Sequence, residues 1–332
     1  MLVVAGVATF VTGLLAGGSS MWLYHRRING SPTPANDQRE TRQGGFRLIN
    51  PLLECDAGIE REELLLFDTA VEEFIGNLIK TGKVESVSVY FRDLNNGPWF
   101  GINEREPFAP ASLLKLPVLI AYLKLAEHDP SILNQNYTMT AAALRGPAHD
   151  IPNPRNLVIG RSYRVDELLR QMVTQSDNQA ANLLIRDSRT HFERPFIDLK
   201  IPLPGNSKSE DYMDVKTYSS FFRILFNASY LSDEMSEAAL QLLTQSEFRH
   251  GLVEGVPAGV QVAHKYGEWM VPRPAPAKPL VQFHDCGIVY YPQRPYLLCV
   301  MTRGDDIAEL IGSIRDISRM VYDAVDVQRT QK

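Results

Sequence analysis

The sequence predicts an α/β protein of the α+β sandwich type, in which one antiparallel sheet is built from both ends of the folded body and packs against a helical block. Two observations lead to this prediction. The helical and strand patterns follow the order helix, hairpin, several helices, three strands and helix, without a βαβ repeat. In addition, no glycine-rich phosphate loop follows a predicted strand. The terminal segments therefore supply the sheet, and the middle supplies the helices.

A helix and a hairpin begin the body. Residues 62–82 show a helical apolar period that ends at Gly82, a residue typical of helix C-termini. The stretches 86–94 and 98–102 flank a turn-forming Asn-Asn-Gly sequence and predict a β-hairpin. We expect this hairpin to supply the N-terminal strands of the sheet.

The middle and the end of the chain supply the remaining elements. Helical patterns occur at 107–129, at 164–186 as two helices with a polar turn between them, at 214–227, at 232–245 and at about 306–325. Strand patterns occur at 259–267, 283–291 and 295–303. The proline-rich stretch 272–279 is predicted to be a loop between the first two of these strands.

Composition and charge exclude several classes of protein. The 332 residues are 44% hydrophobic and 22% charged, which is ordinary for a globular protein with a large core. The net charge is only −5 and no long basic run occurs, so we expect no nucleic-acid partner. No Cys/His cluster has metal-site spacing, and we expect neither a metal nor an organic cofactor. We interpret Cys55, Cys286 and Cys299 as packing residues, and leave open a bridge between the last two, which fall in neighbouring predicted strands.

The N-terminus differs from the rest of the chain. Residues 2–24 carry no charge and are long enough to span a bilayer, so 1–28 is predicted to be a transmembrane anchor. Residues 29–59 are predicted to be a flexible linker because their first part is polar and rich in Pro and Gly. The folded body is assigned to 60–328.

Ser112 and Lys115 are the first candidate catalytic residues. They lie three positions apart on one helical face, among leucines. A lysine in such surroundings is costly unless it is paired or its charge is used. A serine hydroxyl becomes a good nucleophile only when a base takes its proton, and a desolvated lysine with a lowered pKa is such a base. The pair therefore indicates nucleophilic catalysis.

Three short motifs occur in a fixed order. Residues 112–115 (SLLK) match S-x-x-K, residues 176–178 are S-D-N, and residues 265–267 (KYG) are close to K-T-G. This set, in this order, is that of class A β-lactamases and penicillin-binding proteins. Over about 60–328 the chain resembles this superfamily of active-site-serine acyl-transferases, which implies a β-lactamase/transpeptidase-like fold.

The resemblance also implies the catalytic roles. Ser112 would be the nucleophile and Lys115 its partner. Ser176 would relay a proton to the leaving nitrogen, and Asp177 would orient the turn through backbone amides.

The substrate-binding residues follow from the same resemblance. Asn178 would contact the substrate amide, Lys265 would attract its carboxylate, and Gly267 would let the backbone approach the ligand. Glu268 and Trp269 are both candidates for the second oxyanion amide, and Trp269 is assigned to the substrate site.

The sequence departs from the class A pattern in two places. Tyr266 replaces a small Thr or Ser that is expected to bind the carboxylate. No E-x-x-x-N occurs between Asn178 and Asp214, so no motif supplies the glutamate that resolves the acyl-enzyme. The substitutes that we consider for this deacylation base are, in order, Asp198, Glu210, Glu193 and Asp211.

We predict a monomeric, membrane-anchored serine hydrolase that opens β-lactam rings through an acyl-enzyme. A D-alanyl-D-alanine carboxypeptidase, or a slow penicillin-binding protein acting on cell-wall peptides, is the alternative within this class. A non-catalytic, membrane-tethered binding module is the alternative from another class, and the intact motif set argues against it.

The resemblance places the catalytic domain outside the cytoplasm, on a single-pass anchor in a bacterial cell membrane. Arg26 and Arg27 follow the apolar stretch, and the positive-inside rule would hold that side in the cytoplasm. The two expectations conflict, and the sequence leaves the orientation open.

Overall fold

The computed structural model describes residues 40–55, 62–95, 98–141, 143, 157–187, 189–205, 207 and 209–330. The anchor predicted at 1–28 and the first part of the predicted linker lie outside these ranges. Within the described ranges, no helix combines the length and the apolar character needed to cross a membrane.

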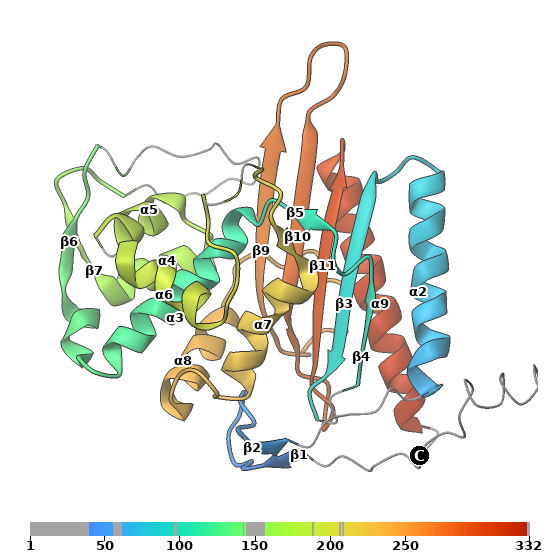
Figure 1. The fold of residues 1–332 in the computed structure, drawn as a ribbon, viewed down its shortest axis with the longest axis horizontal. Coiled ribbons are helices and arrows are strands. Elements are labelled where there is room, and N and C mark those ends of the chain that lie inside the picture. Colours follow the sequence, from blue (N-terminus) through green and yellow to red (C-terminus); the bar gives the residue numbers. More distant parts are fainter. Residues whose placement is uncertain are drawn as a thin grey trace, which may run out of the picture. The chain divides into compact units, whose positions relative to one another are not determined.

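The main sheet has five antiparallel strands in the order β4-β3-β11-β10-β9 (Figure 1). The strands are β3 (Ser86–Asp93), β4 (Trp99–Ile102), β9 (Val262–Val271), β10 (Leu280–Val289) and β11 (Tyr296–Gly304). Strands from the two ends of the body meet where β3 pairs with β11. This topology confirms the predicted fold class.

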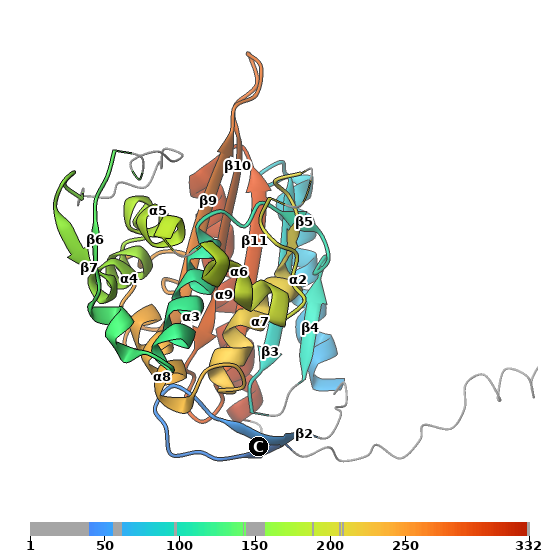
Figure 2. The ribbon, with the colours of Figure 1, turned by 60° about the vertical axis from the view of Figure 1, so that its left-hand side comes forward.

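Helices cover both faces of this sheet (Figure 1). The helices α2 (Glu62–Lys80) and α9 (Ile307–Thr330) lie on one face. The helical block lies on the other, as Figure 2 shows from a second direction. Side chains alternate along β3, so that Val89 and Phe91 pack with residues of α2 and α9 whereas Tyr90 packs with the helical block. The sheet thus separates two hydrophobic cores.

The helical block surrounds α3 (Figure 2). Its described elements are η1 (Ala111–Leu114), α3 (Lys115–Ala126), η2 (Pro130–Asn134), α4 (Val165–Thr174), α5 (Asn178–Asp187), α6 (Arg189–Asp198), α7 (Val215–Phe226) and α8 (Asp233–Leu243). Polar caps fix some of their starts, as at α7, where the Asp214 carboxylate accepts from the backbone N–H of Thr217 at 2.6 Å.

Three short strand pairs complete the described elements. They are β1 (Glu40–Arg42) with β2 (Leu52–Cys55), β5 (Pro107–Phe108) with β8 (Met213–Asp214), and β6 (Asn136–Thr138) with β7 (Ser162–Arg164). The first pair lies in the span predicted as linker. Between its strands, Leu48 and Ile49 are buried, and their backbone N–H groups donate to the Glu237 carboxylate. The folded unit therefore begins before residue 60.

Two helical segments differ from the sequence prediction. The helix predicted at 107–129 is divided: β5 comes first, then the 3₁₀ turn η1, and the α-helix begins only at Lys115. Pro110 and the positive φ of Ala111 (50°) interrupt the regular backbone there. The helix α6 was not predicted, because its sequence is polar and contains Pro195. It is stabilised by tertiary packing, since Phe196 contacts the ring of Phe221 edge to face.

Cys286 and Cys299 form a disulfide. They are directly opposite each other on β10 and β11, and both side chains are fully buried. The interpretation of these two cysteines as unlinked packing residues is therefore wrong. Sequence spacing could not decide this point, because the pairing depends on the register of two strands.

Candidate active site

Three segments that are distant in the sequence meet at the free edge of β9. They are β9 itself, the turn η1 that precedes α3, and the turn between α4 and α5. Gly267 makes the first of these approaches possible: a Cβ at this position would lie 3.0 Å from the backbone N of Leu113 and 3.0 Å from the carbonyl oxygen of Pro110. A side chain would push the strand away from η1. The structure thus shows a close approach of Gly267 to η1, and the approach to a ligand expected at this residue stays a prediction.

Ser112 and Lys115 lie at the start of the α3 segment. The Lys115 Nζ is 2.8 Å from the Ser112 Oγ. Both residues are buried, with 7% and 4% of their surface exposed. The preceding residue, Ala111, has a left-handed backbone (φ 50°), an uncommon conformation for a residue with a Cβ that often marks functional sites. The folded chain therefore holds the serine hydroxyl against a desolvated amine.

Ser176 lies in the turn between α4 and α5 and is also left-handed, with φ 55°. Its Oγ is 3.0 Å from the Lys115 Nζ and 2.8 Å from the Lys265 Nζ. The next residue, Asp177, caps α5 by accepting from the backbone N–H of Gln179 at 2.7 Å. This cap fixes the turn and keeps the serine hydroxyl between the two lysines.

Four oxygen atoms lie within hydrogen-bond distance of the Lys115 amine. They are the Ser112 Oγ, the Ser176 Oγ, the Ser176 carbonyl oxygen and, at 2.7 Å, the Asn178 Oδ1. An ammonium group has only three protons to donate. A neutral amine can instead accept the Ser112 hydroxyl proton and donate to two of the others. Either form satisfies three of the four oxygens, so the contacts allow the amine to exchange a proton with Ser112.

The electrostatics of the two lysines favour this exchange. Burial lowers the pKa of Lys115 well below its ordinary value, and the nearby charge of Lys265 lowers it further. Burial also lowers the pKa of Lys265 to about 7, although Asp285 partly opposes this shift. The lowered pKa suits Lys115 to act as a base, and Lys265 remains available as a cation in mildly acidic solution.

The backbone of β9 decides between the two candidates for the second oxyanion amide. The Tyr266 carbonyl accepts from the Lys265 Nζ, so the backbone groups of Tyr266 point to the free edge of the sheet. Backbone direction alternates along a strand, and therefore the N–H of Glu268 points to the same edge whereas that of Trp269 points to β10. The structure favours Glu268 as the amide donor. Trp269 belongs to the site through its side chain, which lines the cleft.

A cleft of about 280 Å³ opens beside these groups. Ser112, Lys115 and Asn178 line it on one side, and Trp269 lines it on β9. The loop 199–212 contributes further lining residues, including Glu210 and Tyr212. Glu210 is exposed at this surface, so the cleft contains a carboxylate that solvent can reach.

The other three carboxylates considered as deacylation bases are not among the cleft residues. Asp198, which ranked first, pairs with Arg194 at 2.8 Å and accepts from the Tyr230 hydroxyl at 2.7 Å. The hydrogen bond from Arg194 lowers the pKa of this carboxylate, which makes it a weaker base. Asp198 lies at the end of α6, and chain distance from Asp214 did not indicate whether it lines the cleft.

The remaining two carboxylates have other surroundings. Glu193 lies on α6. Asp211 pairs with Arg303 at 3.0 Å and accepts from the Gln282 side chain.

Tyr266, which replaces the small hydroxyl residue, retains a hydroxyl in the site. Its ring stacks on Phe248 with 4.2 Å between centroids, and the Lys265 Nζ lies 4.2 Å from the centre of the Tyr266 ring. Burial raises the pKa of Tyr266 to about 12, so the phenol stays protonated at neutral pH. The Ser176 side chain lowers the pKa of Tyr266, against the larger effect of burial. The substitution therefore changes the size of the residue at this place and keeps an O–H group.

No described group of three or more His, Cys, Asp and Glu side chains is placed to hold a metal ion. The site that the described residues do form consists of a serine, two buried lysines, a second serine and edge-strand amides.

Comparison with known proteins places this site in a family. The beta-lactamase enzyme family matches residues 70–325. A search among curated proteins found no significant match. Among solved structures, PBP-A is 21% identical, with 82% of this chain and 99% of that chain covered and a TM-score of 0.66. A class A beta-lactamase from Mycobacterium abscessus is 20% identical, with coverages of 77% and 99% and a TM-score of 0.64.

A beta lactamase from Xanthomonas campestris pv. campestris is similar to the same extent, at 19% identity, coverages of 78% and 98% and a TM-score of 0.64. At these identities the structures establish a shared fold, and the family match over most of the chain establishes the relationship. The chain belongs to the beta-lactamase enzyme family and is a serine β-lactamase-like hydrolase.

Proposed function

We propose that the chain forms an acyl-enzyme at Ser112 with β-lactams and opens their ring. The observation that carries this proposal is the 2.8 Å contact between the Ser112 Oγ and the buried Lys115 Nζ. A base held at this distance from a serine is the arrangement that nucleophilic acyl transfer requires.

The proposed acylation moves one proton from Ser112, through Lys115 and Ser176, to the leaving nitrogen. The neutral Lys115 amine takes the Ser112 hydroxyl proton while the Ser112 Oγ bonds to the acyl carbon. The backbone N–H groups of Ser112 and Glu268 donate to the oxyanion that develops on the acyl oxygen. The C–N bond then breaks: Ser176 gives its hydroxyl proton to the leaving nitrogen and recovers one from Lys115, which lies 3.0 Å away. Lys115 is neutral again at the end of the step.

Release of the acyl group requires water and a base. We infer that Glu210 supplies this base, because among the four carboxylates considered it is the one that lines the cleft with Ser112. Glu210 is exposed and lies on a loop, in contrast to the buried acylation groups. A base that is less firmly positioned should leave a longer-lived adduct than a glutamate fixed by an E-x-x-x-N motif, since general-base catalysis contributes about 10²–10⁴-fold.

D-alanyl peptides are the second candidate substrates. They share with β-lactams an acyl carbonyl and a nearby carboxylate, which Lys265 would attract. The absence of the E-x-x-x-N motif favours them, because slow hydrolysis of a penicillin adduct is what a cell-wall peptidase shows towards this drug. A PBP-A variant, 20% identical to this chain, is described as an acyl-enzyme complex with penicillin G.

We also propose that the catalytic domain works outside the cytoplasm on the N-terminal anchor. The disulfide between Cys286 and Cys299 supports this location, because disulfides persist in oxidising compartments. Arg26 and Arg27 would hold the catalytic domain in the cytoplasm by the positive-inside rule, whereas the disulfide favours the extracytoplasmic side. Fractionation of cells without detergent tests the anchor: recovery of the full chain in the soluble fraction would exclude it.

Intact mass after incubation with penicillin tests the proposed function. We expect the mass to rise by one penicillin molecule and to return slowly. No increase in mass at any time would reject the acyl-enzyme and favour a binding module.

A further inference from the structure

The chain segment that leads to Ser112 is attached to the sheet by side chains. The strand β5 ends at Phe108, and the next residue, Ala109, is buried against β10. The Ala109 N–H donates to the Gln282 Oε1 at 2.9 Å, and the Ala109 carbonyl lies 3.0 Å from the His284 Nε2. Gln282 and His284 are two positions apart on β10 and so point to the same face. Two side chains thus hold both polar groups of one backbone residue.

The attachment lies directly before the nucleophile. Only Pro110 and Ala111 separate Ala109 from Ser112. The Pro110 carbonyl accepts from the Leu113 N–H at 3.0 Å and so closes the turn η1. The position of Ala109 therefore determines where η1, with the Ser112 hydroxyl and N–H, stands relative to the edge of β9.

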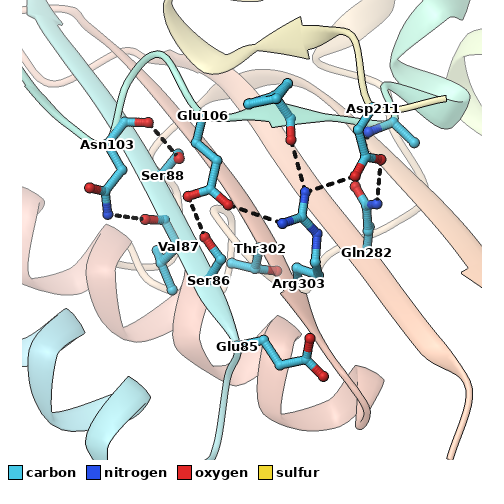
Figure 3. Close-up of polar contacts among 12 residues, drawn as sticks. Glu85, Ser86, Val87, Ser88, Asn103, Glu106, Asp211, Gln282, Thr302 and Arg303 are labelled. Carbon is cyan, nitrogen blue, oxygen red and sulfur yellow. Dashed lines mark hydrogen bonds and ion pairs between the residues drawn. The ribbon is translucent and has the colours of Figure 1, made fainter. Parts of the chain in front are cut away.

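Asp211 fixes the orientation of the Gln282 amide. Its carboxylate can only accept hydrogen bonds, and it accepts from the Gln282 Nε2 at 2.7 Å. The Gln282 Oε1 must then face Ala109. Figure 3 shows the Arg303 guanidinium between Asp211 and Glu106, with N–O distances of 3.0 Å to each. Arg303 thus holds Asp211 in place.

His284 is fixed in one tautomer by its two partners. Its Nδ1 lies 3.3 Å from the Thr302 N–H, which must donate, so the proton is on the Nε2 and is donated to Ala109. Burial lowers the pKa of His284 to about 4, which keeps the ring neutral at neutral pH.

Asp211 also connects this attachment to the cleft. Its neighbours in the chain, Glu210 and Tyr212, line the cleft. We infer that Gln282, oriented by Asp211, is a positioning residue that sets the Ser112 turn against β9 and thereby the geometry of the oxyanion site. This inference rests on one part of the proposed function, namely that an oxyanion forms when Ser112 attacks the substrate.

A reversal of donors and acceptors tests the inference. Asp211→Asn replaces the carboxylate that accepts from both Gln282 and Arg303 with an amide. Gln282→Glu places a second carboxylate beside that of Asp211. In the double variant the new amide can donate to the new carboxylate, which still accepts from Ala109, while Arg303 is still satisfied. We expect each single variant to slow penicillin acylation by about tenfold or more, since small displacements of reacting groups are costly, and the double variant to recover most of this loss.

Two readouts separate positioning from general stability. The C=O stretching frequency of the acyl-enzyme should rise in the single variants, because weaker oxyanion hydrogen bonds polarise the carbonyl less, and should return in the double variant. Ser88→Ala is the matched control. It removes another buried hydrogen bond of the same sheet, from Ser88 to the Asn103 carbonyl at 2.7 Å, and does not involve Ala109 (Figure 3). It should lower Tm and leave the frequency unchanged.

An arylboronic acid that bonds to Ser112 without turnover provides an independent probe. One outcome is that penicillin gives no adduct while the boronate binds each single variant more weakly and the double variant almost as well as the wild type. In that case the proposed function fails and the positioning role stands. Single variants that acylate at the wild-type rate with an unchanged frequency would overturn the positioning role alone. If any variant fails to fold, Gln282→Met replaces it in the comparison with Ser88→Ala. Methionine has nearly the size of glutamine and removes the hydrogen bonds of this side chain to Ala109 and Asp211. A wild-type enzyme that binds neither probe would overturn both inferences.

Discussion

The two sides of the cleft differ in how deeply their polar side chains are buried and in the hydrogen bonds that these side chains make. On one side, Ser112, Lys115 and Ser176 are buried, and the Lys115 amine lies within hydrogen-bond distance of both serine hydroxyls. On the other side, Glu210 is exposed on the loop 199–212. Formation of the acyl bond is proposed to depend on the first side, and its hydrolysis on the second. If these roles are correct, substitutions can change the two half-reactions separately, because none of the described hydrogen bonds or ion pairs joins Glu210 to Ser112, Lys115 or Ser176.

The largest effect is expected at the centre of the buried side. Ser112→Ala removes the nucleophile, so covalent labelling by penicillin should be lost entirely. The free energy of unfolding should change by about 1 kcal/mol, the usual contribution of one hydrogen bond. Intact mass and a thermal melt measure the two quantities. A variant that still gains the mass of the drug would place the nucleophile elsewhere, and an unfolded variant would indicate a structural role.

The next largest effect concerns the exposed side. Glu210→Gln should lengthen the lifetime of the penicillin adduct by about 10²-fold or more if this carboxylate activates water. The acylation rate should not change, because Glu210 does not contact Lys115 in the described contacts. Stopped-flow acylation followed by time-resolved mass separates the two steps. Glu193→Gln, on α6, is the control. Unchanged hydrolysis in the Glu210 variant would contradict this role, and unchanged hydrolysis after replacement of all four candidate carboxylates would leave Lys115 as the base for both steps.

A smaller effect is expected from pH. Because the pKa of Lys265 is about 7, this side chain is charged below pH 7 and neutral above it. The non-covalent affinity for a penicillin should fall by about tenfold as pH rises through this value, since a charge-assisted hydrogen bond to the substrate carboxylate is lost. A penicillin amide, which lacks the carboxylate, should show no such fall. Equal pH dependence of the two ligands would contradict the role of Lys265. Binding is measured with the Ser112→Ala variant to avoid acylation.

The smallest effect is expected for the carboxylate that the sequence ranked first. Asp198→Asn should leave both acylation and hydrolysis unchanged, because Asp198 pairs with Arg194 and Tyr230 and does not line the cleft. A small decrease in Tm is expected, as for other exposed ion pairs. Slower hydrolysis in this variant would mean that α6 moves towards the cleft during turnover, and would remove the distinction between Asp198 and Glu210.

Residues whose placement depends on local chain geometry were predictable from the sequence. Ser112 and Lys115 lie one helical turn apart, so a short motif is enough to bring their side chains together. Ser176 and Asp177 share a tight turn that the Asp177 side chain caps. The helical period and the strand alternation also identified most of the sheet and the helical block, because burial of one face imposes those periods.

Tertiary structure alone decided the features that depend on how distant segments meet. The Cys286–Cys299 bond and the choice of Glu268 over Trp269 as amide donor follow from strand register, which no single segment specifies. The helix α6 is held by aromatic packing against α7 in spite of its own poor helical sequence. The attachment of Ala109 by Gln282 and His284 joins residues that are more than 170 positions apart. The sequence determined which chemistry is present, because reactive side chains recur at fixed local spacings, and packing determined how each reactive atom is placed, because placement depends on contacts across the whole fold.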